Sequence, residues 1–321
     1  MFFALAFLSL VIERLTGYPD WLFNRIGHPV TWIGSLIALL DKKWNRERAP
    51  FSQRKIAGAA ALAVFVGLTA ILTWFVQSAL LVLPFGLLAV AVLGASLPAQ
   101  KSLEQHVGAV AAALEREGVE GGRKAVSMIV GRDPKKLDEA AICRAAIESL
   151  AENFSDGIVA PALWLGLLGL PGGAAYKAIN TADSMIGHRS PRHEAFGWAS
   201  ARLDDLVNLP ASRLSGGLFV VAACFVKGAS PKGAIAAICR DARHHRSPNA
   251  GWPEAALAGA LGFALAGPRS YGGQMIEARF MGEGGRAALV AGDIRTALRL
   301  ARIADLLLIG LFGLLAVLIA L

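Results

Sequence analysis

The chain has 321 residues, of which 55% are hydrophobic and 17% charged, and its mean hydropathy is +0.51. This composition is too apolar for an ordinary soluble globular domain. The net charge of +8 lies mainly in segments between apolar blocks, so lipid head groups rather than nucleic acid are the expected anionic neighbours. The three cysteines are widely separated and form no CxxC pair, which argues against a disulfide framework or a zinc site.

The first third of the chain contains the longest uncharged blocks. Residues 1–12 lack a charged start and a small-residue cleavage site, so we expect a short first span rather than a removable signal peptide. Residues 56–76 and 78–97 carry no charge over 21 and 20 residues. Each is long enough to cross a hydrocarbon layer of about 30 Å. Both are predicted to be membrane spans, joined by a short connection at Gln77.

Basic residues set the expected orientation of these spans. Residues 41–55 contain six lysines and arginines, which predicts that this segment is cytoplasmic. Gln77 would then lie outside, and the polar segment 98–157 would return as a helical cytoplasmic insertion. Within it we expect a helix over residues 101–117 that ends at Gly118, and a second helix from about Asp138 to a turn at residues 155–157.

The later apolar blocks are shorter or interrupted. Residues 158–176 are uncharged but contain two prolines and four glycines, which favours a re-entrant or interfacial segment over a simple span. Residues 214–226 share this ambiguity, and residues 306–321 are predicted to form a final span. Strand patterns are almost absent. We therefore predict an all-α, polytopic integral membrane protein with about four to five transmembrane helices and broken or re-entrant segments, forming a single integrated domain over residues 1–321.

The first of four polar clusters lies at the end of the insertion. Glu148 and Glu152 are spaced i,i+4 and share a helix face. With Asp156 at the following turn they supply the few carboxylates that Mg²⁺ prefers. The alternative is a surface ion pair between Arg144 and Glu148, also spaced i,i+4, and the sequence leaves both interpretations open.

The second cluster follows the broken apolar segment. Asn180, Asp183 and Ser184 lie on one helical face, and Lys177 precedes Asn180 by one turn. A lysine near an amide and a carboxylate suits a phosphate and its metal ion. Solvation of a helix surface is the less favoured interpretation, because an apolar segment leads directly into the cluster.

The third and fourth clusters contain further carboxylates and most of the basic candidates. Asp204 and Asn208 share a face, whereas Asp205 pairs with Arg202 at i,i+3, so one aspartate is expected to be structural and the other a metal ligand. Arg213 follows a proline and is a candidate phosphate contact. The fourth cluster, residues 240–254, is basic and either binds an anionic substrate or flanks the membrane. Its adjacent histidines do not share a face, which argues against a two-histidine metal site.

Common nucleotide and hydrolase motifs are absent: the sequence has no GxxxxGK[ST] loop, no GxGxxG after a strand, no GxSxG elbow and no HExxH helix. Six strings nevertheless resemble, in order, the adenosylcobinamide-phosphate synthase family of cobalamin biosynthesis (the CobD/CbiB family). They are GHPVTWIG (27–34), GRD (131–133), ESLAENFSDGIVAP (148–161), YKAINTADSMIG (176–187), FGWASARLDDLVNLPASR (196–213) and SPNAGWPEAALAGAL (247–261). Pro134, His188 and His193 depart from the family pattern and are left out of the site.

The resemblance implies an ATP-dependent ligase that joins adenosylcobyric acid to 1-amino-2-propanol or its O-phosphate by an amide bond. An unactivated carboxylate does not react usefully with an amine, so an acyl phosphate is the expected route, and phosphoryl transfer needs Mg²⁺ and cations. Catalytic roles are assigned to Glu148, Glu152, Asp183, Asp204 and Asp205. Binding of Mg²⁺ is assigned to Glu152, Asp156, Asp183 and Asp204. Binding of phosphates and substrates is assigned to Lys177, Arg202, Arg213, Asn153, Asn180, Ser184, Asn208, His245 and Asn249.

Because ATP is cytoplasmic, the resemblance also implies a multi-pass protein of the inner cell membrane whose clusters all face the cytoplasm. Residues 158–176 are then predicted not to cross the membrane, and residues 214–226 not to cross or to cross only with a compensating partner. Two alternatives stay open: a Mg²⁺-dependent membrane prenyltransferase, and a non-enzymatic membrane sensor of the same superfamily. The sequence leaves the oligomeric state open as well.

Overall fold

The computed structural model describes residues 1–130, 135–267, 269–271, 274–276 and 279–321. The regular secondary structure of this described part is helical apart from short strands of two or three residues, so the predicted all-α fold is confirmed. The chain divides into two compact units, each assembled from segments far apart in the sequence. Unit 1 comprises Met1–Ala99, Ala160–Asn208 and Leu311–Leu321, and unit 2 comprises Gln100–Val159 and Leu209–Gly310. The single integrated domain stays a prediction.

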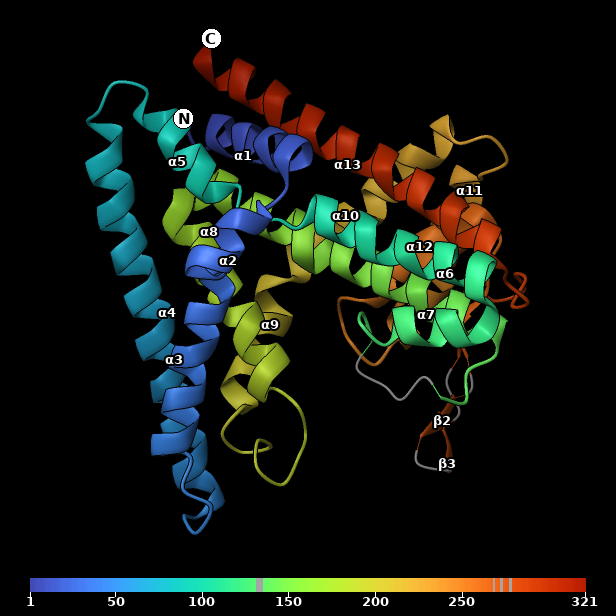
Figure 1. Cartoon of the computed structure of the whole chain (residues 1–321), viewed down its shortest axis with the longest axis horizontal. Coiled ribbons are helices and arrows are strands. Elements are labelled where there is room, and N and C mark those ends of the chain that lie inside the picture. Colours follow the sequence, from blue (N-terminus) through green and yellow to red (C-terminus); the bar gives the residue numbers. More distant parts are fainter. Residues whose placement is uncertain (131–134, 268, 272–273, 277–278) are drawn as a thin grey trace. The chain divides into compact units, whose positions relative to one another are not determined.

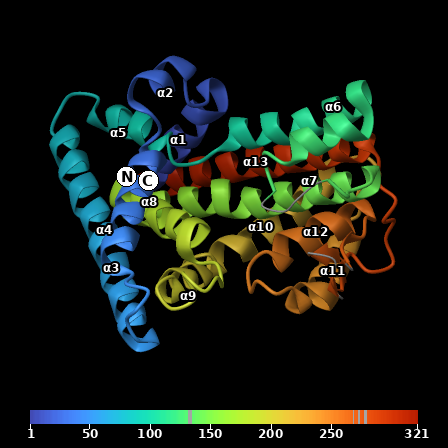
Figure 2. The same ribbon diagram turned by 60° about the horizontal axis from the view of Figure 1, so that its bottom comes forward.

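Unit 1 carries the longest apolar helix of the chain's first third and the helices that support the second and third polar clusters (Figure 1). Its helices are α1 (Phe2–Thr16), α2 (Asp20–Ile26), α3 (Pro29–Trp44), α4 (Phe51–Leu81), α5 (Gly86–Gly94), α8 (Ala160–Ile186) and α9 (Trp198–Val207). The short connection between α3 and α4 makes them antiparallel neighbours, which lie side by side in both Figure 1 and Figure 2.

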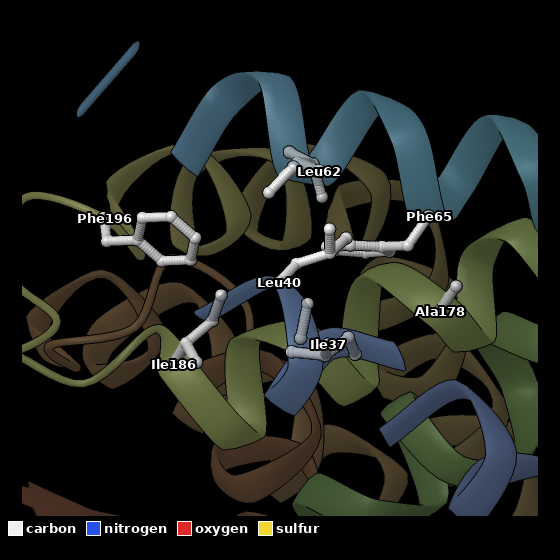
Figure 3. Packing of buried hydrophobic residues seen from close by; sticks show 9 residues of the cluster. Ile37, Leu40, Leu62, Phe65, Ala178, Ile186 and Phe196 are labelled. Atoms are coloured by element: carbon white, nitrogen blue, oxygen red, sulfur yellow. The ribbon is translucent and has the colours of Figure 1, made fainter. Parts of the chain in front are cut away.

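A hydrophobic core joins α3, α4 and the second half of α8. It contains Ile37 and Leu40 of α3, Phe65 of α4 and Ala178 of α8, all less than one tenth exposed (Figure 3). Phe196, from the segment between α8 and α9, closes one end of this core. Burial of these apolar side chains fixes the part of α8 that carries the second polar cluster.

Unit 2 contains the polar insertion and the helices around the fourth cluster. Its elements are α6 (Gln100–Val126), α7 (Glu139–Phe154), η1 (Ser155–Val159), α10 (Leu209–Ala222), η2 (Ala223–Phe225), α11 (Pro231–Asp241), η3 (Ala242–His244), α12 (Gly251–Leu261), β1 (Leu265–Ala266), β2 (Arg269–Tyr271), β3 (Gln274–Ile276), β4 (Phe280–Met281) and most of α13 (Ala291–Ala320). The pairs β1–β4 and β2–β3 are antiparallel. α6 and α7 lie side by side (Figure 2).

Local sequence features set several helix boundaries in unit 2. Asp138 is the N-cap of α7, and its carboxylate accepts the N–H of Ala141 at 2.7 Å, which confirms the predicted start. Gly118 has φ of 64° inside α6, so the predicted break there is confirmed, although a further helical segment continues to Val126. The predicted turn at residues 155–157 is wrong: the backbone continues as the π-helical turn η1 into α8.

The predicted span over residues 78–97 is also wrong. α4 continues to Leu81, and Phe85 adopts a left-handed conformation with φ of 61° before α5 begins at Gly86. A Cβ at Gly86 would lie 2.0 Å from the carbonyl oxygen of Leu80, so this tight turn depends on glycine. α5 has nine residues, which span only about 13 Å. Gln77 is therefore no connection but a residue within α4.

Several described helices are nevertheless suited to a membrane. Three helical runs are long and apolar enough to cross one, or up to five if each of two bent pairs is counted as one span. The three runs are Phe51–Leu81, Glu139–Ile186 and Ala291–Ala320, and the pairs are Phe2–Thr16 with Trp21–Trp44 and Trp198–Val207 with Leu209–Phe225. This number agrees with the predicted four to five.

Candidate active site

The second and third polar clusters meet in unit 1, where α8 packs against α9. Asn180 Nδ2 donates to Asp204 Oδ1 at 3.3 Å, and Asn208 Nδ2 donates to Asp204 Oδ2 at 3.0 Å. The Tyr176 hydroxyl donates to Asn208 Oδ1 at 2.8 Å. We call these four residues the Asp204 network. Each helix contributes an i,i+4 pair, Tyr176 with Asn180 and Asp204 with Asn208, so each pair lies on one face.

The Asp204 network is shielded from solvent. Asn208 has no exposed surface, Tyr176 is 2% exposed and Asp204 is 8% exposed. Buried polar groups are costly unless they are hydrogen-bonded, and here both oxygens of Asp204 accept amide donors. The network thus holds a buried carboxylate in one orientation without a cationic side chain among its hydrogen-bond donors.

Two further aspartates surround this network. Asp183 is half-buried near the end of α8 and repels both Asp204 and Asp205 electrostatically. The predicted pair of Arg202 and Asp205 is confirmed, with Nη1 and Oδ2 3.7 Å apart. Ser184 is exposed, and its hydroxyl donates to the Asn180 carbonyl within α8. Three carboxylates therefore gather where α8 ends and α9 packs against it, which concentrates negative charge.

Lys177 lines a pocket of about 270 Å³ in unit 1. The pocket is formed by His28, Val30 and Thr31 at the start of α3, by residues 96–99, and by Lys177. Ligand pockets for drug-sized molecules occupy roughly 300–1,000 Å³, so this one suits a small molecule better than a nucleotide or a corrin. His28 was not predicted as a site residue, although it lies in the GHPVTWIG string.

The first cluster lies in unit 2 and has a different character. Glu148 is buried, and its Oε1 accepts the N–H of Ala266 at 2.9 Å, which ties α7 to β1. Arg144 donates to the Ala287 carbonyl at 2.6 Å. Glu152 and Asn153 are exposed and Asp156 is half-buried. Glu148 thus has a structural contact that the sequence did not indicate, and the catalytic and metal roles in this cluster stay predictions.

Arg213 and the fourth cluster meet in unit 2. Arg213 Nη1 donates to Asn249 Oδ1 at 3.0 Å and to the Pro248 carbonyl at 3.2 Å. Its guanidinium lies over the Trp252 ring, 4.7 Å from the centroid. His245 Nε2 lies 3.7 Å from a carboxylate oxygen of Glu254. Stacking and hydrogen bonds therefore fix the guanidinium in place, and its role as a phosphate contact stays a prediction.

The predicted residues therefore separate into two groups. Unit 1 holds Lys177, Asn180, Asp183, Ser184, Arg202, Asp204, Asp205 and Asn208, whereas unit 2 holds Glu148, Glu152, Asn153, Asp156, Arg213, His245 and Asn249. The GRD string at residues 131–133 and Pro134 lie outside the described residues. Among the residues that are described, no group of three or more histidine, cysteine, aspartate or glutamate side chains is arranged to hold a metal ion by itself.

Comparison with known proteins shows to which family the chain belongs. Residues 6–301 match the family described as CobD/Cbib protein. The chain belongs to the CobD/CbiB family. It is 55% identical over 289 residues to a "Cobalamin biosynthesis protein CobD" of Sinorhizobium sp, covering 89% of this chain and 90% of that protein. No solved structure matches it.

Two other relatives carry the same name. A protein of Rhodobacter capsulatus is 52% identical over 274 residues, covering 84% of this chain and 83% of its own length. The protein of Brucella suis is 49% identical over 302 residues, covering 91% and 90%. The family and these relatives point to a role in cobalamin biosynthesis.

Proposed function

We propose that this chain is an ATP-dependent ligase that joins adenosylcobyric acid to 1-amino-2-propanol or its O-phosphate. Membership of the CobD/CbiB family supports the pathway. The observation that carries the chemistry is the Asp204 network, a buried carboxylate held by amides beside Asp183 and Asp205. Such a concentration of negative charge favours a cationic ligand, either a metal ion that accompanies phosphates or the ammonium group of the amine substrate.

The proposed reaction has two steps. A carboxylate oxygen of the corrinoid takes the terminal phosphoryl group of ATP, and ADP leaves. The amine nitrogen then forms the amide bond with the activated carbonyl carbon, phosphate leaves, and one proton is released. A carboxylate within hydrogen-bond reach of the amine accepts that proton, and Asp205 is our candidate, because Asp183 is proposed below as a metal ligand. Lys177, Arg202 and Arg213 are proposed to hold phosphate groups.

The donor set of unit 1 fits Mg²⁺. Proteins bind this ion through one or two carboxylates, while waters and substrate phosphates complete its coordination. Asp183 and Asp204 supply such a pair, and Glu152 and Asp156 stay predicted ligands in unit 2. When bound, Mg²⁺ neutralises charge on the phosphates. The protein's own contribution is to hold Asp204 in place and to keep the surrounding carboxylates available.

We also propose that the protein lies in the inner cell membrane with this site facing the cytoplasm. ATP is present on that side, and the basic segment at residues 41–55 favours the same orientation for the start of α4. Labelling of a cysteine introduced at Ser184 or Met185 tests the topology, because both residues are exposed near the end of α8. Labelling from the cytoplasmic side alone is expected, and labelling from the outside alone would refute the orientation.

The reaction is tested with purified protein, adenosylcobyrate, either amine, ATP and Mg²⁺, by assaying the amide product and ADP together. We expect both products in equal amounts. Asp183→Asn should lower turnover by at least about 100-fold while the protein remains folded and inserted, whereas the exposed Glu194→Gln serves as the matched control. Failure of the wild-type protein to form the amide with competent substrates would refute the ligase, and near-normal activity of Asp183→Asn would remove Asp183 from the site.

A further inference from the structure

Gln77 is a buried amide in the largely apolar second half of α4. It is 6% exposed, whereas Trp74, Phe75 and Val76, which precede it, are between 42% and 60% exposed. Gln77 Oε1 accepts the N–H of Leu170 at 2.8 Å. The bond joins α4 to α8, two helices that pack closely together in unit 1.

Leu170 follows the point at which α8 is broken. Gly169 has φ of 72° and ψ of −164°, and Pro171 lies inside the helix. Such a break deprives backbone groups of their intrahelical partners, and in an apolar environment a neighbouring side chain must replace them. Gln77 supplies that replacement for the Leu170 N–H.

The space around the break allows little change. A Cβ at Gly169 would lie 2.6 Å from Gln77 Oε1 and 3.0 Å from a ring carbon of Phe2. Glycine is thus required both by its positive φ and by the close approach of α4. The break is a defined junction between two helix segments rather than a loose bend.

The segment after this junction carries the candidate site. Lys177, Asn180, Asp183 and Ser184 all lie on α8 beyond Leu170, and Asn180 reaches Asp204 at 3.3 Å. A small change in direction at the junction would displace these side chains relative to α9. Misplacement of a reacting group by about 1 Å can lower a rate by about 100-fold.

We propose that Gln77 is a positioning residue of the candidate active site: its hydrogen bond to Leu170 fixes the direction in which the second half of α8 presents its polar side chains to α9. The proposal rests on the proposed ligase function for its catalytic consequence. Its structural part, the fixed junction, is independent of which reaction the site performs.

The test compares Gln77→Met, which removes the acceptor at similar length, with Gln77→Glu, which keeps an acceptor oxygen. Thr73→Val is the matched control, because Thr73 lies one turn earlier in α4 and its hydroxyl bonds only within α4. Spin labels at Leu167→Cys and Met185→Cys, one on each half of α8, report their separation in full-length protein in nanodiscs. Cys224 and Cys239 are exposed and are replaced by serine in all samples.

We expect Gln77→Met to shift or broaden the distance distribution and to lower kcat about 100-fold, with KM for each substrate within about threefold of wild type. Gln77→Glu and Thr73→Val should retain both the distribution and kcat. An unchanged distribution in Gln77→Met would overturn the proposal, as would a changed distribution with normal kcat. If Gln77→Met fails to insert, Gln77→Asn, whose amide is one methylene shorter, replaces it under the same criteria. A wild-type protein that makes no amide would refute the ligase function, while the distance comparison would still decide the junction.

Discussion

Replacement of Asn208 by leucine tests whether the Asp204 network stabilises the fold of unit 1. Asn208 has no exposed surface and makes two of the network's hydrogen bonds, to Tyr176 at 2.8 Å and to Asp204 at 3.0 Å. Leucine has a similar size but neither donates nor accepts. The Tyr176 hydroxyl would lose its acceptor, at about 1–3 kcal/mol, and Asp204 would lose a donor to a charged group, at about 1.5–3 kcal/mol.

The buried leucine recovers part of this cost, roughly 1–2 kcal/mol, so we expect Asn208→Leu to lower the free energy of unfolding by about 2–4 kcal/mol. The double-mutant cycle with Tyr176→Phe is more specific. Tyr176→Phe alone should cost about 1 kcal/mol, but in the Asn208→Leu background it should cost less, because the bond between the two side chains is already gone.

The free energies are measured by SDS titration of protein in mixed micelles, followed by tryptophan fluorescence. Ser184→Ala is the control, since its hydroxyl bonds only within α8, and its change should stay within about 0.5 kcal/mol. Wild-type stability of Asn208→Leu, or costs that add to within about 0.5 kcal/mol in the cycle, would show that the Tyr176–Asn208 bond does not stabilise the protein.

Two further predictions concern unit 2. Arg213→Lys should lower thermal stability by about 1–3 kcal/mol, because lysine cannot both lie over Trp252 and reach Asn249; a normal unfolding midpoint would refute this. Asp241 is buried, which raises the pKa of its carboxyl, but donors from Arg240 and two backbone N–H groups outweigh burial and hold that pKa below its usual range. The stabilisation is therefore present above about pH 4, the ordinary range of an aspartate pKa, and is lost as pH falls through the lowered pKa of the folded state. Asp241→Asn should be less stable than wild type near neutral pH, and the difference should shrink as the solution becomes more acidic, as measured by thermal unfolding at each pH.

Spacing along a helix predicted the contacts that lie within one helix. The shared face of Asp204 and Asn208 and the pair of Arg202 and Asp205 both follow from about 3.6 residues per turn, and the structure confirms them. The contact between Asn180 and Asp204 joins two helices, so only their packing could reveal it. Tyr176 could have been found from its i,i+4 spacing to Asn180.

Counting uncharged residues did not predict where helices begin and end. Residues 78–97 contain no charge, yet the first four of them are the end of α4. A tight turn before Gly86 then separates α4 from α5. A hydropathy window responds to side chains, whereas this boundary depends on a left-handed backbone at Phe85 and on close backbone approach at Gly86. The same window treated Gln77 as an interruption, because it is polar.

The position of Gln77 was nevertheless encoded in the sequence. Thr69, Thr73 and Gln77 are spaced i,i+4 and continue the buried stripe of α4 that begins at Gly58 and includes Phe65. Gln77 bonds to the backbone of a neighbouring helix, whereas the hydroxyls of Thr69 and Thr73 bond to carbonyl groups within α4. The stripe therefore indicates which face of α4 is buried. Such a stripe distinguishes a residue inside a span from a connection between spans.

Four buried or half-buried aspartates of this protein are held in two different ways. Three of them bind an arginine directly, at 2.7, 2.6 and 2.6 Å: the pairs are Asp41–Arg192, Asp241–Arg240 and Asp293–Arg286. Asp204 is buried as well, but its hydrogen bonds come from the neutral amides of Asn180 and Asn208. An arginine neutralises a carboxylate and completes a structural pair, whereas neutral amide donors orient the carboxyl group without supplying an opposite charge. The lack of an arginine among the described partners of Asp204 separates it from these three aspartates and supports our proposal that a cationic ligand binds beside it.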